Sequence, residues 1–121
     1  MDKEYVLQVA ETAKNQLLAT TPMNVVLSWG VEKFIATVFK EMPALKFNVN
    51  GRLFKGFVVV ALNGSDYYEI YLINYQETKS VTDEASFDEI GEIIDKAIES
   101  GTNKAEYEQF CRQQRYKLLM G

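Results

Sequence analysis

The sequence predicts an α+β fold made of N-terminal helices, a three-stranded antiparallel β-meander and a C-terminal helical hairpin. Three observations predict it. Apolar residues recur at helical spacing before residue 20 and after residue 86, and they alternate with polar residues between 45 and 75. Two Asn-Gly dipeptides interrupt the alternating part, as in β-hairpins. A fourth strand is added if residues 25–29 are extended, and 121 residues fit a single domain, 1–121.

The N-terminal part predicts two helices. Residues 2–19 carry a helical apolar stripe, with Asp2 as cap and a Thr-Thr-Pro break after it. Residues 25–29 are ambiguous, since a short strand and a buried first turn of helix have the same composition. From residue 31 the spacing of Phe34, Ile35, Val38 and Phe39 predicts a helix that runs to Met42 and ends at Pro43.

A change of period marks the meander. Residues 45–49 alternate, and Asn50-Gly51 is the dipeptide that type I′ turns prefer. A long strand over 52–62, a turn at 63–66 and a returning strand over 67–75 follow. Asp66 is expected to bond the amides of the second turn.

The pairing of these strands assigns residues to two faces. If Val49 pairs with Arg52, one face carries Leu45, Phe47, Phe54, Val58, Val60, Leu62, Tyr67, Tyr71, Ile73 and Tyr75. The other face carries Leu53, Phe57, Val59, Ala61, Tyr68, Ile70 and Leu72. Both faces are apolar, so we expect helices on both sides of the sheet or, as the less favoured alternative, a partner on one of them.

The C-terminal third predicts the helical hairpin. After a polar loop over 76–85, Ser86 and Glu89 form a capping box, and a helix follows with isoleucines on its inner face. Ser100-Gly101 ends this helix. A last helix begins at Asn103, and its inner face includes Cys111.

Residues across the first two thirds of the chain resemble those of small uncharacterised proteins of tailed bacteriophages and related mobile elements. The matching residues are Gly30, Phe34, Leu45, Phe47, Val58, Val60, Leu62, Asn63, Asp66, Tyr68 and Ile70. The resemblance covers about residues 5–73. It implies a mobile-element origin and a strand at residues 25–29, and it transfers no activity and no catalytic residue.

Several chemistries are not supported by the sequence. Without histidine the common nucleophile triads are missing, and one cysteine cannot supply a zinc site. The glycines are spread singly, with no phosphate-binding loop. We therefore expect no catalytic residue, cofactor or metal. Asp88, Glu92, Asp95 and Glu99 share a helical face, which a cation or basic partner would use but which is more simply a solvated face.

Candidate contact residues come from charge and aromatic patterns. The net charge is −4, with bases concentrated between 40 and 55 and acids between 77 and 99. On the first hairpin Lys46 and Lys55 are expected opposite each other, with Arg52 at the tip. They protect an edge strand from pairing with other chains or, alternatively, contact phosphate or an acidic partner. Tyr67, Tyr71 and Tyr75 are expected on one sheet face, as core cover or as a contact surface.

The sequence thus favours a non-enzymatic accessory or protein-interaction protein that binds a protein partner or forms a homo-oligomer. A nucleic-acid contact module using Lys46, Arg52 and Lys55, and a small-molecule-binding domain, are the alternatives. With no signal peptide and no apolar segment long enough to span a bilayer, we expect a cytoplasmic location and no membrane partner.

Overall fold

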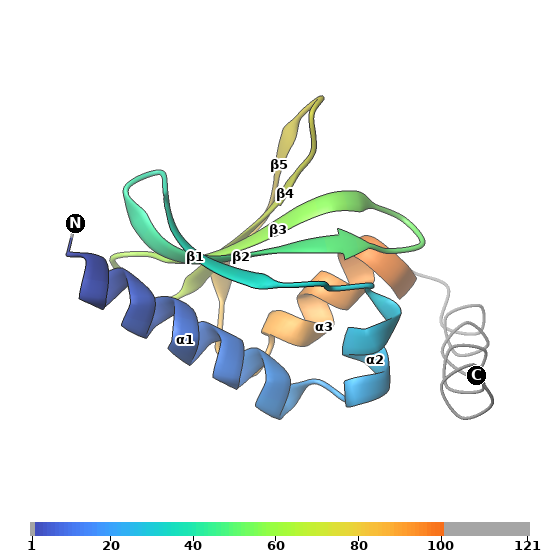
Figure 1. The fold of residues 1–121 in the computed structure, drawn as a ribbon, viewed down its shortest axis with the longest axis horizontal. Helices are drawn as coiled ribbons and strands as arrows, with labels where there is room; N and C mark the ends of the chain where they lie inside the picture. The colour runs from blue at the N-terminus through green and yellow to red at the C-terminus, as the bar shows by residue number, and fades with distance from the viewer. Residues whose placement is uncertain (1, 101–121) are drawn as a thin grey trace.

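A computed structural model describes residues 2–100. The elements follow in the order α1 (Lys3–Thr20), α2 (Met23–Ser28), β1 (Phe34–Phe39), β2 (Met42–Asn50), β3 (Lys55–Leu62), β4 (Tyr68–Ile73), β5 (Thr78–Ala85), α3 (Ile90–Asp95) and the π-helical turn η1 (Lys96–Ser100) (Figure 1). The α+β class is confirmed. The second helix of the expected C-terminal hairpin, from Asn103 onward, lies outside the described residues.

The first helix forms as its sequence predicts. The side chain of Asp2 accepts a hydrogen bond from the amide of Glu4, which satisfies one of the free donors of the first turn. Its buried face consists of Val6, Val9, Ala10, Ala13 and Leu17. The helix ends just before Pro22, which cannot continue the hydrogen-bond ladder.

Residues 23–28 are helical, so the strand that the phage-protein resemblance implies at residues 25–29 is wrong. Helix α2 begins directly after Pro22, whose fixed φ suits the start of a helix. Gly30 has a φ of +69° and ends the helix in the left-handed region that glycine tolerates. The turn places Trp29 fully inside the core, where its ring stacks on Phe47 at 6.3 Å between centroids.

The helix predicted over residues 31–42 is wrong, because this segment forms β1 and the start of β2. A two-residue turn joins them, with Lys40 and Glu41 at φ values of +49° and +65° and Phe39 paired with Met42. This is the geometry that was expected at Asn50-Gly51. Pro43 is tolerated inside β2, since the ladder with β3 begins only at Ala44.

The five strands form one antiparallel sheet in the order β1-β2-β3-β4-β5, so every connection is a hairpin. The predicted meander is present as β2, β3 and β4, but a count of three or four strands is too low. Besides β1, the expected polar loop over 76–85 is mostly strand β5, which pairs with β4 from Ile73–Thr78 to Tyr68–Ala85.

The first predicted turn is wider than expected. Val49 pairs with Gly56 and not with Arg52, and a loop of residues 51–54 joins the strands. The shift of four residues is even, so the residues of β2 and β3 keep their predicted faces. Gly51 has no positive φ here; a side chain at this position would meet the backbone oxygen of Ile98 at 2.5 Å. Glycine is therefore required at position 51 by the close approach of the π-helical turn η1, and not by the geometry of the β2–β3 turn.

The second predicted turn has the opposite consequence. The side chain of Asn63, and not Asp66, accepts hydrogen bonds from turn amides, those of Ser65 and Tyr67. Leu62 consequently pairs with Tyr68. Relative to the predicted pairing this is a slip of one residue, which moves every side chain of β4 to the other face. Tyr68, Ile70 and Leu72 therefore enter the core, and Tyr71 and Ile73 leave it.

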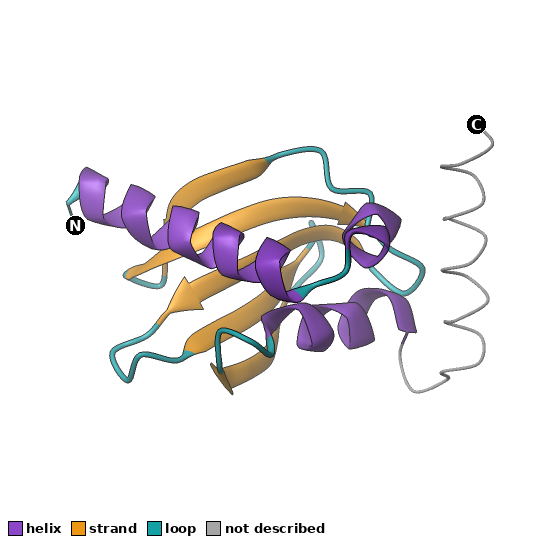
Figure 2. Cartoon of the chain, turned by 90° about the horizontal axis from the view of Figure 1, so that it is seen from below, coloured by secondary structure: helices purple, strands orange, loops and turns teal. Residues whose placement is uncertain are grey.

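All three α-helices cover the same face of the sheet, as Figures 1 and 2 show, so the expectation of helices on both sides is wrong for the described residues. Residues from every helix join the strands in one core. Its largest fully buried side chains are Trp29, Phe47, Leu17, Ile70, Ile90, Ile94 and Ile98. Among the described residues no helix is long and apolar enough to cross a membrane.

The third helix begins at Ile90, later than a helix capped by Ser86 would, and its N-cap residue Glu89 makes no side-chain cap hydrogen bond. The carboxylate of Glu89 accepts a hydrogen bond from the amide of Ser86, which is one half of a capping box. Hydrogen bonding with Ser86, first through its side chain and then through its backbone amide, lowers the pKa of Glu89. The inner face of the helix is apolar, as its spacing predicts, with Ile90, Ile94 and Ile98 fully buried.

Candidate interaction surfaces

The face of the sheet that the described helices do not cover is called the open face. In Figure 1 the β1–β2 and β4–β5 hairpins both rise from the sheet on the side away from the helices. On this face Phe39 of β1 and Tyr71 of β4 are in contact, with ring centroids 4.8 Å apart. Small buried residues of the two strands between them, Ala44 and Ala61, leave room for the rings. The sheet thus buries a second, smaller cluster against itself.

Lysine side chains cover this open face further. The ammonium group of Lys40 lies 4.8 Å from the ring centre of Tyr71, and that of Lys46 lies 4.5 Å from the ring centre of Phe57. The Tyr71 hydroxyl donates a 2.6 Å hydrogen bond to Glu69. That hydrogen bond, with desolvation and the charges of Glu69 and Asp83, raises the pKa of Tyr71 to about 12.

The predicted basic hairpin is only partly assembled. Lys46 and Lys55 lie on the same face, as expected, but not opposite each other, because Lys46 pairs with Val59 and Lys55 with Asn50. Both strands are internal, so these lysines do not blunt an edge. Arg52 donates from Nε to the backbone oxygen of Glu99 at 2.9 Å, which ties the β2–β3 loop to the end of η1.

The three candidate tyrosines lie apart. Tyr71 is buried on the open face, Tyr67 lies in the β3–β4 turn, and Tyr75 lies in the β4–β5 turn with 95% of its surface exposed. The prediction that they form one sheet surface is wrong. Of the six predicted contact residues, Lys46, Lys55 and Tyr71 share a face, and the other three have separate surroundings.

The acidic row on the third helix is solvated at Asp88 and Glu92, which are exposed, but not at Asp95 and Glu99. Asp95 is buried and accepts a 2.9 Å hydrogen bond from the indole nitrogen of Trp29. Glu99 is fully buried, and neither of its carboxylate oxygens has a hydrogen-bond partner among the described residues. Desolvation, and to a lesser degree the charge of Asp95, raises the pKa of Glu99 to about 7, against the opposing effect of Arg52. No group of three or more potential ligand residues within 2–100 is placed to hold a metal.

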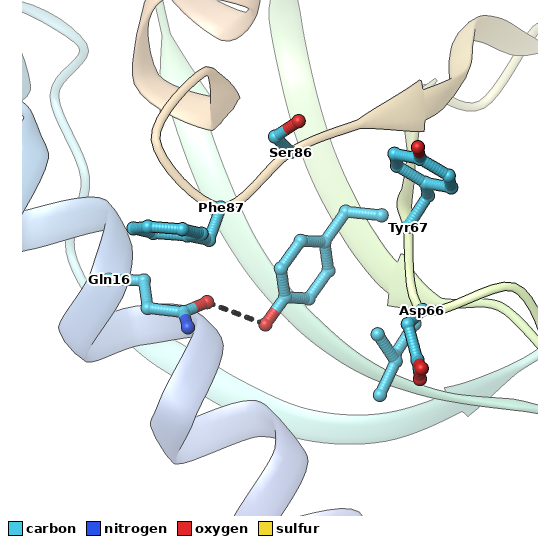
Figure 3. A pocket seen from close by; sticks show the side chains of 7 residues that line it. Gln16, Asp66, Tyr67, Ser86 and Phe87 are labelled. Carbon is cyan, nitrogen blue, oxygen red and sulfur yellow. Dashed lines mark hydrogen bonds between the residues drawn. The ribbon is translucent and has the colours of Figure 1, made fainter.

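A pocket of about 410 Å³ opens at the end of the sheet where α1, the β3–β4 turn and the link to α3 meet (Figure 3). Phe87 and Gln16 lie on one side of it, and Asp66 and Tyr67 on the other. Across its floor the hydroxyl of Tyr68 donates a 2.7 Å hydrogen bond to Gln16. These two polar groups are therefore already paired.

The edge strand β1 is the surface that sequence reasoning missed, because its residues were assigned to a helix. It has the sequence FIATVF, without charge, proline or glycine, and among residues 2–100 it pairs only with β2. Ile35 and Val38 remain exposed, Val38 with 49% of its surface. A groove of about 260 Å³ runs between β1 and α1, lined by Leu7, Ala10, Glu11, Lys14, Phe34, Ile35, Ala36 and Leu45.

Comparison of the chain with protein-family models, with curated proteins and with solved structures found no match. The resemblance to phage proteins therefore stays a prediction.

Proposed function

We propose that this chain is a non-enzymatic protein-interaction protein that binds by accepting an extended polypeptide strand along β1. The observation that carries the proposal is the composition of that edge. Edge strands normally carry charges, prolines or bulges that prevent further pairing, and a long apolar edge without them is a template for an added strand. Strand β1 has six residues and none of these protections.

The backbone geometry of β1 suits strand addition. A two-residue hairpin closes on a hydrogen-bonded pair, here Phe39 and Met42, so alternate residues from Phe39 backward direct their backbone groups toward β2. The amides of Lys33 and Glu32, just before the strand, are likewise held from the β2 side by the side chain of Asn48. The backbone groups of Ala36 and Val38 then point to the free edge, where a partner strand pairs with them.

The groove beside β1 supplies side-chain recognition on the helix-bearing face. Ala36 is small and Leu7 of α1 is exposed, so an apolar side chain of an added strand enters between them. Burying a side chain of valine or leucine size contributes about 1.5–3 kcal/mol. Strand addition draws affinity from the backbone and specificity from such alternate side-chain sites.

A nucleic-acid contact is less well supported. Single-stranded nucleic acids stack on accessible aromatic rings beside a positive groove. Here Lys40 lies over Tyr71 and Lys46 over Phe57, while Arg52 is tied to the helix end. The carboxylate of Glu69 lies on the same face. The lysine stems thus cover apolar surface of the sheet.

A small-molecule site is also less well supported. The pocket in Figure 3 is bordered by the exposed aromatic residues Tyr67 and Phe87, but the polar pair on its floor is satisfied within the protein. A ligand would have to break that hydrogen bond or bind without using either of its two polar groups.

The proposal is tested with a fluorescein-labelled peptide of the β1 segment, residues 33–41 (KFIATVFKE), added to the protein at low concentration. We expect saturable binding by fluorescence anisotropy with a Kd of about 10–100 µM. Val38→Lys places a charge on the edge and should weaken binding about 10-fold or more. Thr78→Lys, an exposed position on the opposite edge strand, is the matched control and should change it less than about 2-fold.

Circular dichroism and thermal unfolding establish that both variants are folded. If the peptide does not bind, or if Val38→Lys and Thr78→Lys weaken it equally, strand addition at β1 is wrong.

A further inference from the structure

We infer that the strand accepted by this edge is β1 of a second copy, so that the two sheets join into one continuous sheet around a twofold axis. The inference rests on the proposed function and names its partner. It is argued from the register in which β1 pairs best with itself, since an isologous contact must satisfy both copies with one set of residues.

The backbone restricts the possible registers. Ala36 and Val38 present their hydrogen-bonding groups at the free edge, so antiparallel self-pairing must match residues of this set. A shift by one residue would place the helix-covered face of one copy beside the open face of the other. With Thr37 on the twofold axis, Ala36 exchanges backbone hydrogen bonds with Val38 of the second copy, and both faces continue across the contact.

On the helix-bearing face this register fills the groove. Val38 of the second copy lies opposite Ala36, the small residue in the groove floor, and beside the exposed Leu7. The register two residues away would instead place Val38 opposite Phe34, whose ring already fills its site against Phe47 with 5.2 Å between centroids. The half-exposed valine thus fits where the structure leaves room.

On the open face the same register pairs Ile35 with Phe39 of the second copy, and Thr37 with its equivalent. The exposed Ile35 gains an aromatic neighbour, a favourable cross-strand combination, and two threonines face each other at the axis. Both contacts occur on the face that no described helix covers.

Charges at the two ends of the strand agree with this arrangement. Lys33 precedes β1 and Glu41 lies in the turn after it, both exposed. Antiparallel pairing about Thr37 brings Lys33 to the end of the second copy's β1, where the turn that contains Glu41 begins, twice in each dimer. The two residues carry opposite charges, and β1 itself has no charge that would repel its copy.

A disulfide at the axis tests the register. In a non-hydrogen-bonded antiparallel pair the Cα atoms are about 4.5 Å apart, within the range of a disulfide. In a Cys111→Ser background, Thr37→Cys should form a covalent dimer under mild oxidation, as measured by mass spectrometry without reductant. Ile35→Cys is the matched control: its sulfur would be about 13 Å from its equivalent, four residues away along the strands, and should not cross-link.

The oligomeric state of the unmodified protein is the second measurement. Sedimentation equilibrium at concentrations up to about 100 µM should show a dimer. Val38→Lys places a charge on β1 of both copies and should raise the dissociation constant of the dimer about 100-fold. Thr78→Lys should change this dissociation constant by less than about 2-fold.

The outcomes separate this inference from the proposed function. If the protein is monomeric throughout and Thr37→Cys does not cross-link, the second copy is not the partner. Binding of the β1 peptide would in that case still support strand addition with another chain. A dimer that is unaffected by Val38→Lys and cross-links no better at residue 37 than at residue 35 uses another surface, and overturns the inference.

Discussion

The two edges of this sheet are built differently. Strand β1 at one edge is an uncharged run, while β5 at the other edge carries Lys79, Asp83 and Glu84. The pairing of β5 with β4 also contains two register shifts, whereas β1 pairs with β2 without interruption. Charges and bulges are the usual means of preventing edge-to-edge association. The difference indicates that association is prevented at β5 and permitted at β1.

This comparison also corrects the role predicted for the basic hairpin. Lys46 and Lys55 were expected to protect an edge, but they lie on β2 and β3 inside the sheet. Lys46 instead covers the ring of Phe57 on the open face. The protective charges belong to β5, in a segment that the sequence predicts as a loop.

Among changes that leave the six residues of β1 intact, charge reversal in the turn after β1 is expected to have the largest effect on association. Glu41→Lys creates two unfavourable contacts with Lys33 in each dimer and should weaken self-association about 10-fold or more. Adding Lys33→Glu restores opposite charges and should recover most of the affinity. Sedimentation equilibrium at low ionic strength measures both, because salt screens exposed pairs.

Asp83→Lys on β5 reverses a charge of the same kind at the other edge and is the control. It should leave association unchanged. A failure of Lys33→Glu to rescue Glu41→Lys would contradict the register proposed for the two strands.

An intermediate effect, on stability rather than on association, is expected from Glu99. Its pKa is raised from 4.5 to about 7 by burial, so the folded chain holds a proton that the unfolded chain has released between these values. The contribution of this group to stability is therefore present below pH 4.5 and is lost as pH rises to 7. Glu99→Gln should stabilise the protein at pH 8 by about 1–2 kcal/mol, with no gain at pH 4.5.

Urea unfolding of the wild-type protein and of Glu99→Gln at both pH values measures the difference in their free energies of unfolding. The contributions of the other titrating groups cancel in this difference. An equal difference at both values would show that Glu99 titrates normally. Because this side chain lies at the end of the third helix, away from both edges, the variant should not change association once it is folded.

The smallest effect is expected on the open face. Tyr71→Phe removes the hydroxyl that donates to Glu69 but keeps the ring contact with Phe39. Losing one such hydrogen bond should cost about 1 kcal/mol at neutral pH. Urea unfolding checks this value, and sedimentation should show unchanged association. A loss of dimer would mean that this face, and not the β1 edge alone, forms the contact.

Local signals in the sequence predicted a large part of the fold. Asp2 and the apolar stripe after it predicted α1, and the spacing of the isoleucines after Glu89 predicted the inner face of the third helix. Alternation predicted β2, β3 and β4. In each case the signal lies within a few residues, so the chain itself determines the element.

The errors occurred where one pattern fits two structures. Phe34, Ile35, Val38 and Phe39 have helical spacing, but a strand whose two faces both contact apolar groups has the same composition. Strand β5 is polar because it is a protected edge, and a polar segment reads as a loop. In both cases pairing with the neighbouring strand across a hairpin decided between the alternatives.

The sequence by itself determined which segments are apolar, where α1 begins and which chemistries lack the residues that they need. Only the tertiary structure decided the register of the paired strands and which face of the sheet the helices cover. One further residue in the turn before Tyr68 exchanged the two faces of β4, because side chains alternate with a period of two. Helices then cover one face, and the other bends over its own small residues. The same packing makes β1 an unprotected edge strand. The sequence could not show this, because no local pattern indicates which strand lies at the edge of a sheet.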